Sequence, residues 1–170
     1  MKKMTKFLAL AIMMLAFTAG TFAQVSATAS ATATIITPIA ITKTTDMNFG
    51  NIAVNASGGT VVLTPAGGRS TTSGCTLPAA TGTVTAASFT VTGEGTSTYV
   101  ISLPANHTIT RVSGTETMIV DVFASTPSGT GALTGGTQTL LVGATLNVGV
   151  SQVPGSYTNV AGFTVTVNYN

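Results

Sequence analysis

The chain has 170 residues, of which 44% are hydrophobic and only 6% are charged. Six basic and four acidic side chains give a formal net charge of +2, but three of the lysines lie within the first six residues. The other basic side chains are Lys43, Arg69 and Arg111, too few and too dispersed to neutralise nucleic-acid phosphates or to bind an anionic membrane.

Residues 1–23 have the organisation of a secretory signal peptide. A lysine-rich start precedes the apolar run FLALAIMMLAFTAG, which is too short to span a bilayer as a helix. The run ends in TFAQ, where small residues favour cleavage between Ala23 and Gln24. The sequence therefore predicts export to the periplasm, the outer cell surface or the medium, without membrane insertion after cleavage. About 147 residues would remain, enough for one domain.

Residues 24–36 alternate between small apolar and hydroxyl side chains. A period of two is typical of a β-strand, in which successive side chains point to opposite faces. We predict an N-terminal strand here, and two partners are open: the sheet of its own domain, or a neighbouring copy. The apolar face would consist of Val25, Ala27, Ala29, Ala31, Ala33 and Ile35.

Residues 37–170 read as one all-β domain. Thr, Val and Gly dominate, no apolar period of three to four residues is found, and short alternating segments are separated by Gly, Pro and Asn. This pattern predicts a β-sandwich of about seven to nine antiparallel strands. We expect hairpins between 83–93 and 97–104 and between 107–112 and 116–125. The other predicted strands are at 39–49, 60–65, 139–150 and 163–169.

The last segment of the chain shows the clearest alternation. Phe163, Val165, Val167 and Tyr169 are predicted to point inward, and the intervening Thr and Asn residues outward. Tyr157 follows Pro154 and Gly155 and has two interpretations. It either donates a hydrogen bond to upstream backbone as a tyrosine corner, or it is an ordinary half-buried aromatic residue.

The sequence gives no indication of catalysis. His107 is the only histidine, no G-x-S-x-G elbow is present, and we expect His107 at the surface. Cys75 is the only cysteine in the chain. Its interpretations are a buried thiol, an intermolecular bridge or, least favoured, a catalytic thiol that would depend on His107. We expect no catalytic residues, no cofactor and no metal site, because zinc and calcium sites need several clustered ligands.

Several segments resemble a known family: MNFGNIAV, GGTVVLTPAGGRS, ASFTVTG, YVISLP, MIVDVF, LVGATLNVG and PGSYTNVAGFTVTVNYN. They are similar to the secreted bacterial family called domain of unknown function 4402, from about Ile35 to Asn170. That family in turn resembles the spore coat protein U and archaic chaperone-usher pilin group. The shared features are an early FG, a late PG-x-Y and a final alternating strand with Tyr as its penultimate residue.

The resemblance implies an immunoglobulin-like, pilin-like sandwich that lacks one strand. The N-terminal segment of each subunit would fill the gap in the next, which makes residues 25–35 a candidate donor strand and Phe163, Val165, Val167 and Tyr169 the candidate acceptor edge. Partners would be other copies or a periplasmic assembly chaperone. Two features depart from the pattern, because the donor residues are mostly alanine and Cys75 has no partner cysteine.

Two functions follow as expectations. The first is a non-enzymatic structural subunit of cell-surface or extracellular fibres. The alternative is a monomeric, adhesin-like module that recognises a glycan or a protein through the loops at 66–76 and 126–137. Sugar binding would need exposed aromatic side chains. The sequence instead suggests inward positions for Phe49, Phe89, Tyr99, Phe123, Tyr157, Phe163 and Tyr169.

Overall fold

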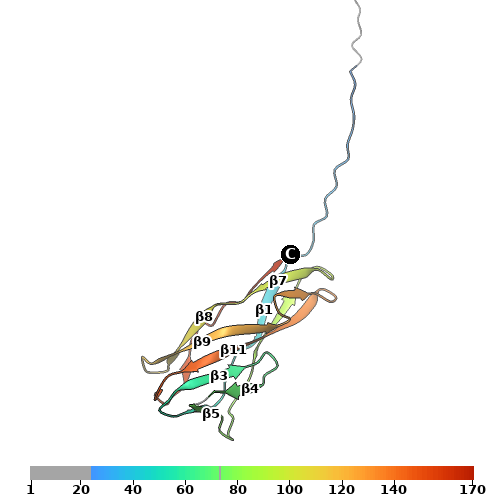
Figure 1. Ribbon diagram of the computed structural model, residues 1–170. Helices are drawn as coiled ribbons and strands as arrows, with labels where there is room; N and C mark the ends of the chain where they lie inside the picture. Colours follow the sequence, from blue (N-terminus) through green and yellow to red (C-terminus); the bar gives the residue numbers. More distant parts are fainter. Residues whose placement is uncertain (1–23, 73) are drawn as a thin grey trace, which may run out of the picture. The chain divides into compact units, whose positions relative to one another are not determined.

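The computed structural model describes residues 24–72 and 74–170 (Figure 1). The predicted signal peptide, residues 1–23, lies outside the described residues, as does Ser73. The chain divides into two units, residues 1–35 and residues 36–170, and each is considered by itself.

The described part of the first unit, residues 24–35, contains no strand, and each of its residues is exposed. Val25 and Ile35, its two largest side chains, are 94% and 97% exposed. The structure therefore assigns no strand to a segment whose alternation predicts one.

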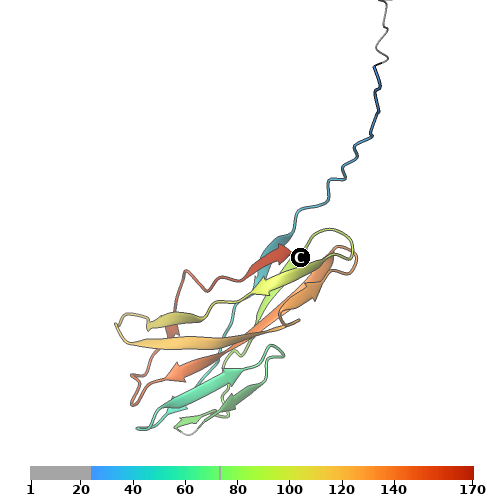
Figure 2. The same ribbon diagram turned by 45° about the horizontal axis from the view of Figure 1, so that its top comes forward.

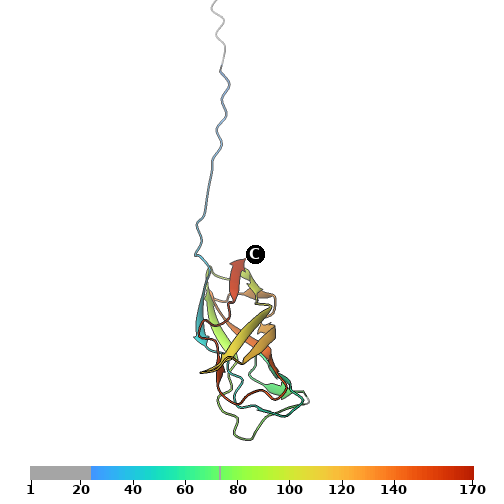
Figure 3. The same cartoon turned by 90° about the vertical axis from the view of Figure 1, so that its left-hand side faces the viewer.

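The second unit is all-β and antiparallel, and its described residues contain no helix. The larger sheet has eight strands in the order β1-β6-β11-β9-β8-β12, with β3 beside the second half of β11 and β4 beside β3. Its strong curl gives the domain the form of a half-barrel (Figure 3). The strands are β1 (Ala40–Thr45), β3 (Gly59–Leu63), β4 (Arg69–Thr71), β6 (Ala87–Thr92), β8 (Asn106–Arg111), β9 (Thr117–Thr126), β11 (Thr137–Val148) and β12 (Tyr157–Thr158).

Two smaller sheets complete the domain. A three-stranded sheet has the order β10-β7-β13, and a two-stranded sheet consists of β2 and β5. The described residues thus contain thirteen strands where we expected seven to nine, because several strands have only two or three residues. The bounds are β2 (Ala53–Val54), β5 (Cys75–Thr76), β7 (Thr98–Ser102), β10 (Thr130–Ala132) and β13 (Thr166–Tyr169).

One predicted hairpin is confirmed and the other is wrong. β8 and β9 pair as expected, and the Arg111 amide donates to the Glu116 carbonyl across the turn. β6 and β7 lie in different sheets, although a short turn joins them. Both edges of β6 are already occupied, by β1 on one side and β11 on the other, so β7 pairs with β10 and β13 instead.

The core follows the inward faces of the long strands. β11 is the central strand, because β9 pairs with one of its edges and β6 and β3 share the other. Leu140 and Val142 are fully buried on it. Burial of each such side chain stabilises the fold by about 1.5–3 kcal/mol. One core cluster joins β6, β7, β11 and β13, and the other joins β3, β9 and β11.

Candidate functional site

The domain of residues 36–170 contains an open groove of about 1510 Å³. Two segments that are far apart in the sequence line it, residues 41–54 and residues 152–165. The first segment begins in β1 and the second leads into β13. The remaining lining consists of Thr83 and of a mostly apolar floor from four strands of the larger sheet: Ala87, Phe89, His107, Ile109, Met118, Val120, Leu146 and Val148.

Each of the two flanking strands has one unpaired edge within the described residues. β1 pairs only with β6, and β13 pairs only with β7. An unpaired edge presents a row of backbone N–H and C=O groups that can pair with another strand. Figure 2 shows β1 (cyan) and β13 (red) close together at the end of the domain that carries the C-terminus. The groove therefore combines an apolar floor with the free edge of β1 on one side and, on the other, the segment that leads into the free edge of β13.

The predicted acceptor residues alternate as expected. Val165 and Val167 are buried, and Phe163 and Tyr169 are half-buried. Phe163 and Val165 precede the first residue of β13, Thr166, and both line the groove, whereas Val167 and Tyr169 do not. The structure thus divides the predicted edge into a groove-lining half and a half that continues past the groove.

Phe163, which lines the groove, is the centre of an aromatic cluster. Its ring centroid lies 4.9 Å from that of Phe123, 6.4 Å from that of Phe89 and 6.1 Å from that of His107. His107, for which we expected a surface position, is half-buried and lines the open groove. The alternation NHTITR accounts for this partial burial: His107 is two residues from Ile109 and shares its face of β8.

A small polar cluster fixes the start of the domain at the end of β13. The Thr37 amide donates to Glu94 Oε2 at 3.0 Å, and the Tyr169 hydroxyl donates to the Thr37 carbonyl at 2.8 Å. The same hydroxyl accepts a hydrogen bond from the Glu94 amide at 2.6 Å. We call Thr37, Glu94 and Tyr169 the Thr37 clamp. It uses both backbone hydrogen-bonding groups of Thr37.

We predict that the stability of the Thr37 clamp depends on pH. The hydrogen bond from Thr37 to the ionised carboxylate lowers the pKa of Glu94 below its ordinary value. A carboxyl group with a depressed folded-state pKa stabilises the fold above its unfolded pKa, and the contribution is lost as the pH falls through the folded pKa. We expect the Thr37 amide to exchange faster with solvent at acidic pH once intrinsic rates are corrected. In Glu94→Gln this acid-dependent increase should be absent; the same increase in both proteins would contradict the assignment.

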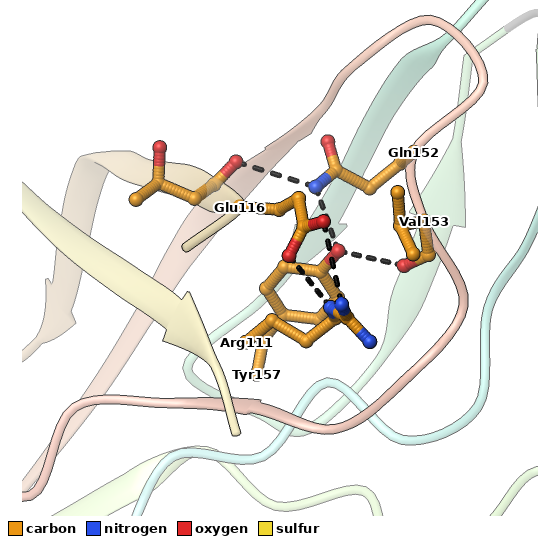
Figure 4. Close-up of polar contacts among 6 residues, drawn as sticks. Arg111, Glu116, Gln152, Val153 and Tyr157 are labelled. Carbon is orange, nitrogen blue, oxygen red and sulfur yellow. Dashed lines mark hydrogen bonds and ion pairs between the residues drawn. The ribbon is translucent and has the colours of Figure 1, made fainter. Parts of the chain in front are cut away.

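A second polar cluster holds the chain on its way to β13 (Figure 4). The Tyr157 hydroxyl donates to the Val153 carbonyl at 2.6 Å, which confirms the tyrosine-corner interpretation. Gln152 Nε2 donates to the same hydroxyl at 2.8 Å. Beside it, Arg111 Nε donates to Glu116 at 2.6 Å, and this hydrogen bond lowers the pKa of Glu116. The cluster fixes the loop that lines one side of the groove.

We expect Tyr157→Phe to lower the free energy of unfolding by about 1 kcal/mol, because the ring is kept and only the hydroxyl hydrogen bonds are lost. Urea unfolding monitored by circular dichroism measures this difference. Thr158→Ser, at the adjacent exposed position of β12, is the control and should leave the unfolding midpoint nearly unchanged. An equal shift in both variants would show that the corner contributes nothing of its own.

The loops at 66–76 and 126–137, which the alternative function would use to bind a glycan or a protein, largely form strands and contacts within the domain. Residues 66–76 include β4 and β5, and residues 126–137 include β10. The Arg69 guanidinium donates to the carbonyls of Phe49 and Asn51. Cys75 is buried, and burial raises the pKa of its thiol. Every aromatic side chain among the described residues is buried or half-buried, as the sequence predicts.

Neither a metal cluster nor a membrane-spanning helix was found in the described part of the chain. Residues 24–72 and 74–170 contain no group of three or more His, Cys, Asp or Glu side chains placed to hold a metal ion. Over the same ranges, no helix has the length and apolarity required to cross a bilayer.

Comparison with curated proteins and with solved structures gives no match to the chain. Comparison with protein families gives a match over residues 39–169 to the family described as domain of unknown function, DUF4402. The match begins next to the Thr37 clamp and ends at Tyr169, so it includes both segments that line the groove. The resemblance to this family inferred from the sequence is thereby confirmed, and the chain belongs to the DUF4402 family.

Proposed function

We propose that the protein is a secreted, non-enzymatic subunit of cell-surface or extracellular fibres that assembles by strand exchange. Its domain would be an incomplete immunoglobulin-like, pilin-like sandwich, and residues 24–36 of one copy would complete the sandwich of the next. The observation that carries the proposal is a groove with an apolar floor, lined on one side by β1 and on the other by the segment that leads into β13, both of these strands having an unpaired edge. Such a site is suited to the addition of an extended segment.

The dimensions of the N-terminal segment fit this role. Twelve residues from 24 to 35, at roughly 3.3 Å per residue, extend about 40 Å, enough to run the length of a sandwich. Its backbone can pair with both free edges, while alternate side chains from Val25 to Ile35 enter the groove. The alanines fill shallow pockets, so backbone hydrogen bonds would supply most of the affinity.

The same contact repeated from copy to copy gives a fibre. The donor segment and the acceptor groove are different surfaces, so the contact is head-to-tail and does not close on itself. The mature chain has a net charge near −1, so electrostatic repulsion between neighbouring copies is weak. Before assembly the apolar floor of the groove is uncovered, which fits the expectation of a periplasmic assembly chaperone as a second partner.

Two substitutions on β8 test the proposal. Ile109 lines the groove, and Thr110 lies on the opposite, exposed face of the same strand. A chain that starts at Gln24 should form filaments in electron micrographs, and so should Thr110→Lys. Ile109→Lys places an ammonium group where the donor strand would pack, so it should remain a folded monomer by circular dichroism and light scattering. Filaments of Ile109→Lys, or a strictly monomeric unmodified chain, would contradict the proposal.

A further inference from the structure

The Thr37 clamp lies at the point where the candidate donor segment joins the domain. Thr37 is three residues before β1, and Tyr169 is the last residue of β13. The clamp therefore joins the beginning of one flanking strand to the end of the other. Glu94 comes from the turn between β6 and β7, so the clamp also ties this junction to both sheets.

Gly93, the residue before Glu94, leaves the space that the Tyr169 hydroxyl occupies. A Cβ atom on Gly93 would lie 2.3 Å from the Tyr169 hydroxyl oxygen and 3.0 Å from a methyl carbon of Leu133. A Cβ atom at position 93 would therefore force a shift of the Tyr169 hydroxyl, which makes two hydrogen bonds of the clamp. Gly93 does not have a positive φ, so close approach rather than backbone conformation explains the glycine.

The clamp has a geometric consequence for residues 24–36. To lie along the free edge of its own β1, this segment would have to reverse direction between residue 36 and Ala40. Pro38 fixes its own φ and restricts Thr37, the residue before it, to extended conformations. The clamp occupies the amide and the carbonyl of Thr37, which a tight reversal would have to redirect. A segment that arrives from another copy needs no such turn.

We propose that the Thr37 clamp prevents residues 24–36 from inserting into the groove of their own domain and so reserves the groove for a second copy. This inference rests on the proposed function. Strand exchange alone requires only a donor and an acceptor. The clamp adds the choice between self-insertion, which ends assembly, and insertion in trans, which extends the fibre.

Two tyrosine-to-phenylalanine variants separate this role from a general loss of stability. Tyr169→Phe removes the hydroxyl of the clamp. Tyr99→Phe removes a comparable hydroxyl on the adjacent strand β7, whose hydrogen bond goes to Gln138 Oε1 at 2.7 Å and does not involve Thr37. We expect the polymerised fraction of Tyr169→Phe to fall about tenfold relative to Tyr99→Phe, as the loss of two hydrogen bonds implies.

Hydrogen exchange identifies the state of the remaining monomer. In Tyr169→Phe monomers, amides of residues 25–35 should be protected, because the segment fills its own groove. Glu94→Ala, which removes the other half of the clamp and leaves the Tyr169 ring in place, should behave in the same way. Polymerisation equal to that of Tyr99→Phe, or monomers with unprotected residues 25–35, would overturn the inference. If the unmodified chain and Tyr99→Phe are themselves monomeric, the proposed function fails and the inference fails with it.

Discussion

A chain that starts at Ile36 is expected to fold as a stable monomer and to form no fibre. The segment removed, residues 24–35, contains no strand, and each of its residues is exposed. Both core clusters consist entirely of residues from Ile39 onward. Loss of an exposed segment without core contacts should change the free energy of unfolding by no more than about 0.5 kcal/mol. Fibre formation, in contrast, should be abolished, because the only candidate donor strand is gone.

Size-exclusion chromatography with light scattering and urea unfolding measure the two parts of this prediction. A peptide of residues 24–36, added in trans, should bind the truncated domain and raise its unfolding temperature. If the truncation unfolds the domain, residues 24–35 belong to its fold and the donor assignment is wrong. If the truncated chain still forms fibres, another surface drives assembly.

A matched pair within the donor segment sharpens this test. Ala29 and Ser30 are adjacent, so in a donor strand they would face opposite sides. Ala29→Asp should abolish assembly, because it places a carboxylate in the apolar groove. Ser30→Asp should assemble nearly as well as the unmodified chain. Equal behaviour of the two variants would contradict an inserted strand with alternating faces.

Gly143→Ala is expected to destabilise the domain by about 2–4 kcal/mol. Gly143 lies on β11 where the paired strand changes from β6 to β3, opposite an irregularity in the pairing with β9. A Cβ atom there would lie 2.2 Å from the Leu63 carbonyl oxygen and 2.6 Å from the Thr64 carbonyl carbon. Both are backbone atoms, so β3 would have to move away from the central strand.

Gly68→Ala is the control for this substitution. A Cβ atom on Gly68 would lie 3.3 Å from Thr64 Oγ1, so the approach is less close than at Gly143 and meets a side chain rather than backbone, and the φ of Gly68 is not positive. We expect a change of no more than about 0.5 kcal/mol at this exposed turn. Urea unfolding of the two variants gives the comparison. If both variants lose a similar free energy of unfolding, the close approach of β3 is not the reason that position 143 requires glycine.

Local signals in the sequence predicted the parts of the fold that local geometry decides. The alternation from Phe163 to Tyr169 fixed which side chains turn inward, and the SGT turn fixed the β8–β9 hairpin. Tyr157 after Pro154 and Gly155 left two interpretations open, and the hydrogen bond to Val153 decides for the tyrosine corner. In each case the residues that determine the structure are close together in the sequence.

The failures concern partners that are distant in the sequence. The turn between β6 and β7 looks like a hairpin turn, but the edges of β6 are occupied by β1 and by β11, which lies more than forty residues further on. Residues 24–36 have the period of a strand, yet alternation shows only that a segment can pair and not which edge is free. The groove and the Thr37 clamp depend on the same kind of distant contact, so the sequence alone revealed neither.

Cross-linking between chains of different isotopic composition tests strand exchange most directly. Single cysteines at Ser26, Thr28, Ser30 or Thr32 would each be combined with a cysteine at Thr164, which is exposed beside the groove. Light and heavy chains would be mixed, assembled, oxidised and digested for mass spectrometry. Strand exchange predicts disulfides that join a light donor segment to a heavy Thr164 position in at least one pair. Disulfides confined to chains of one isotopic composition, in protein that has assembled, would contradict it.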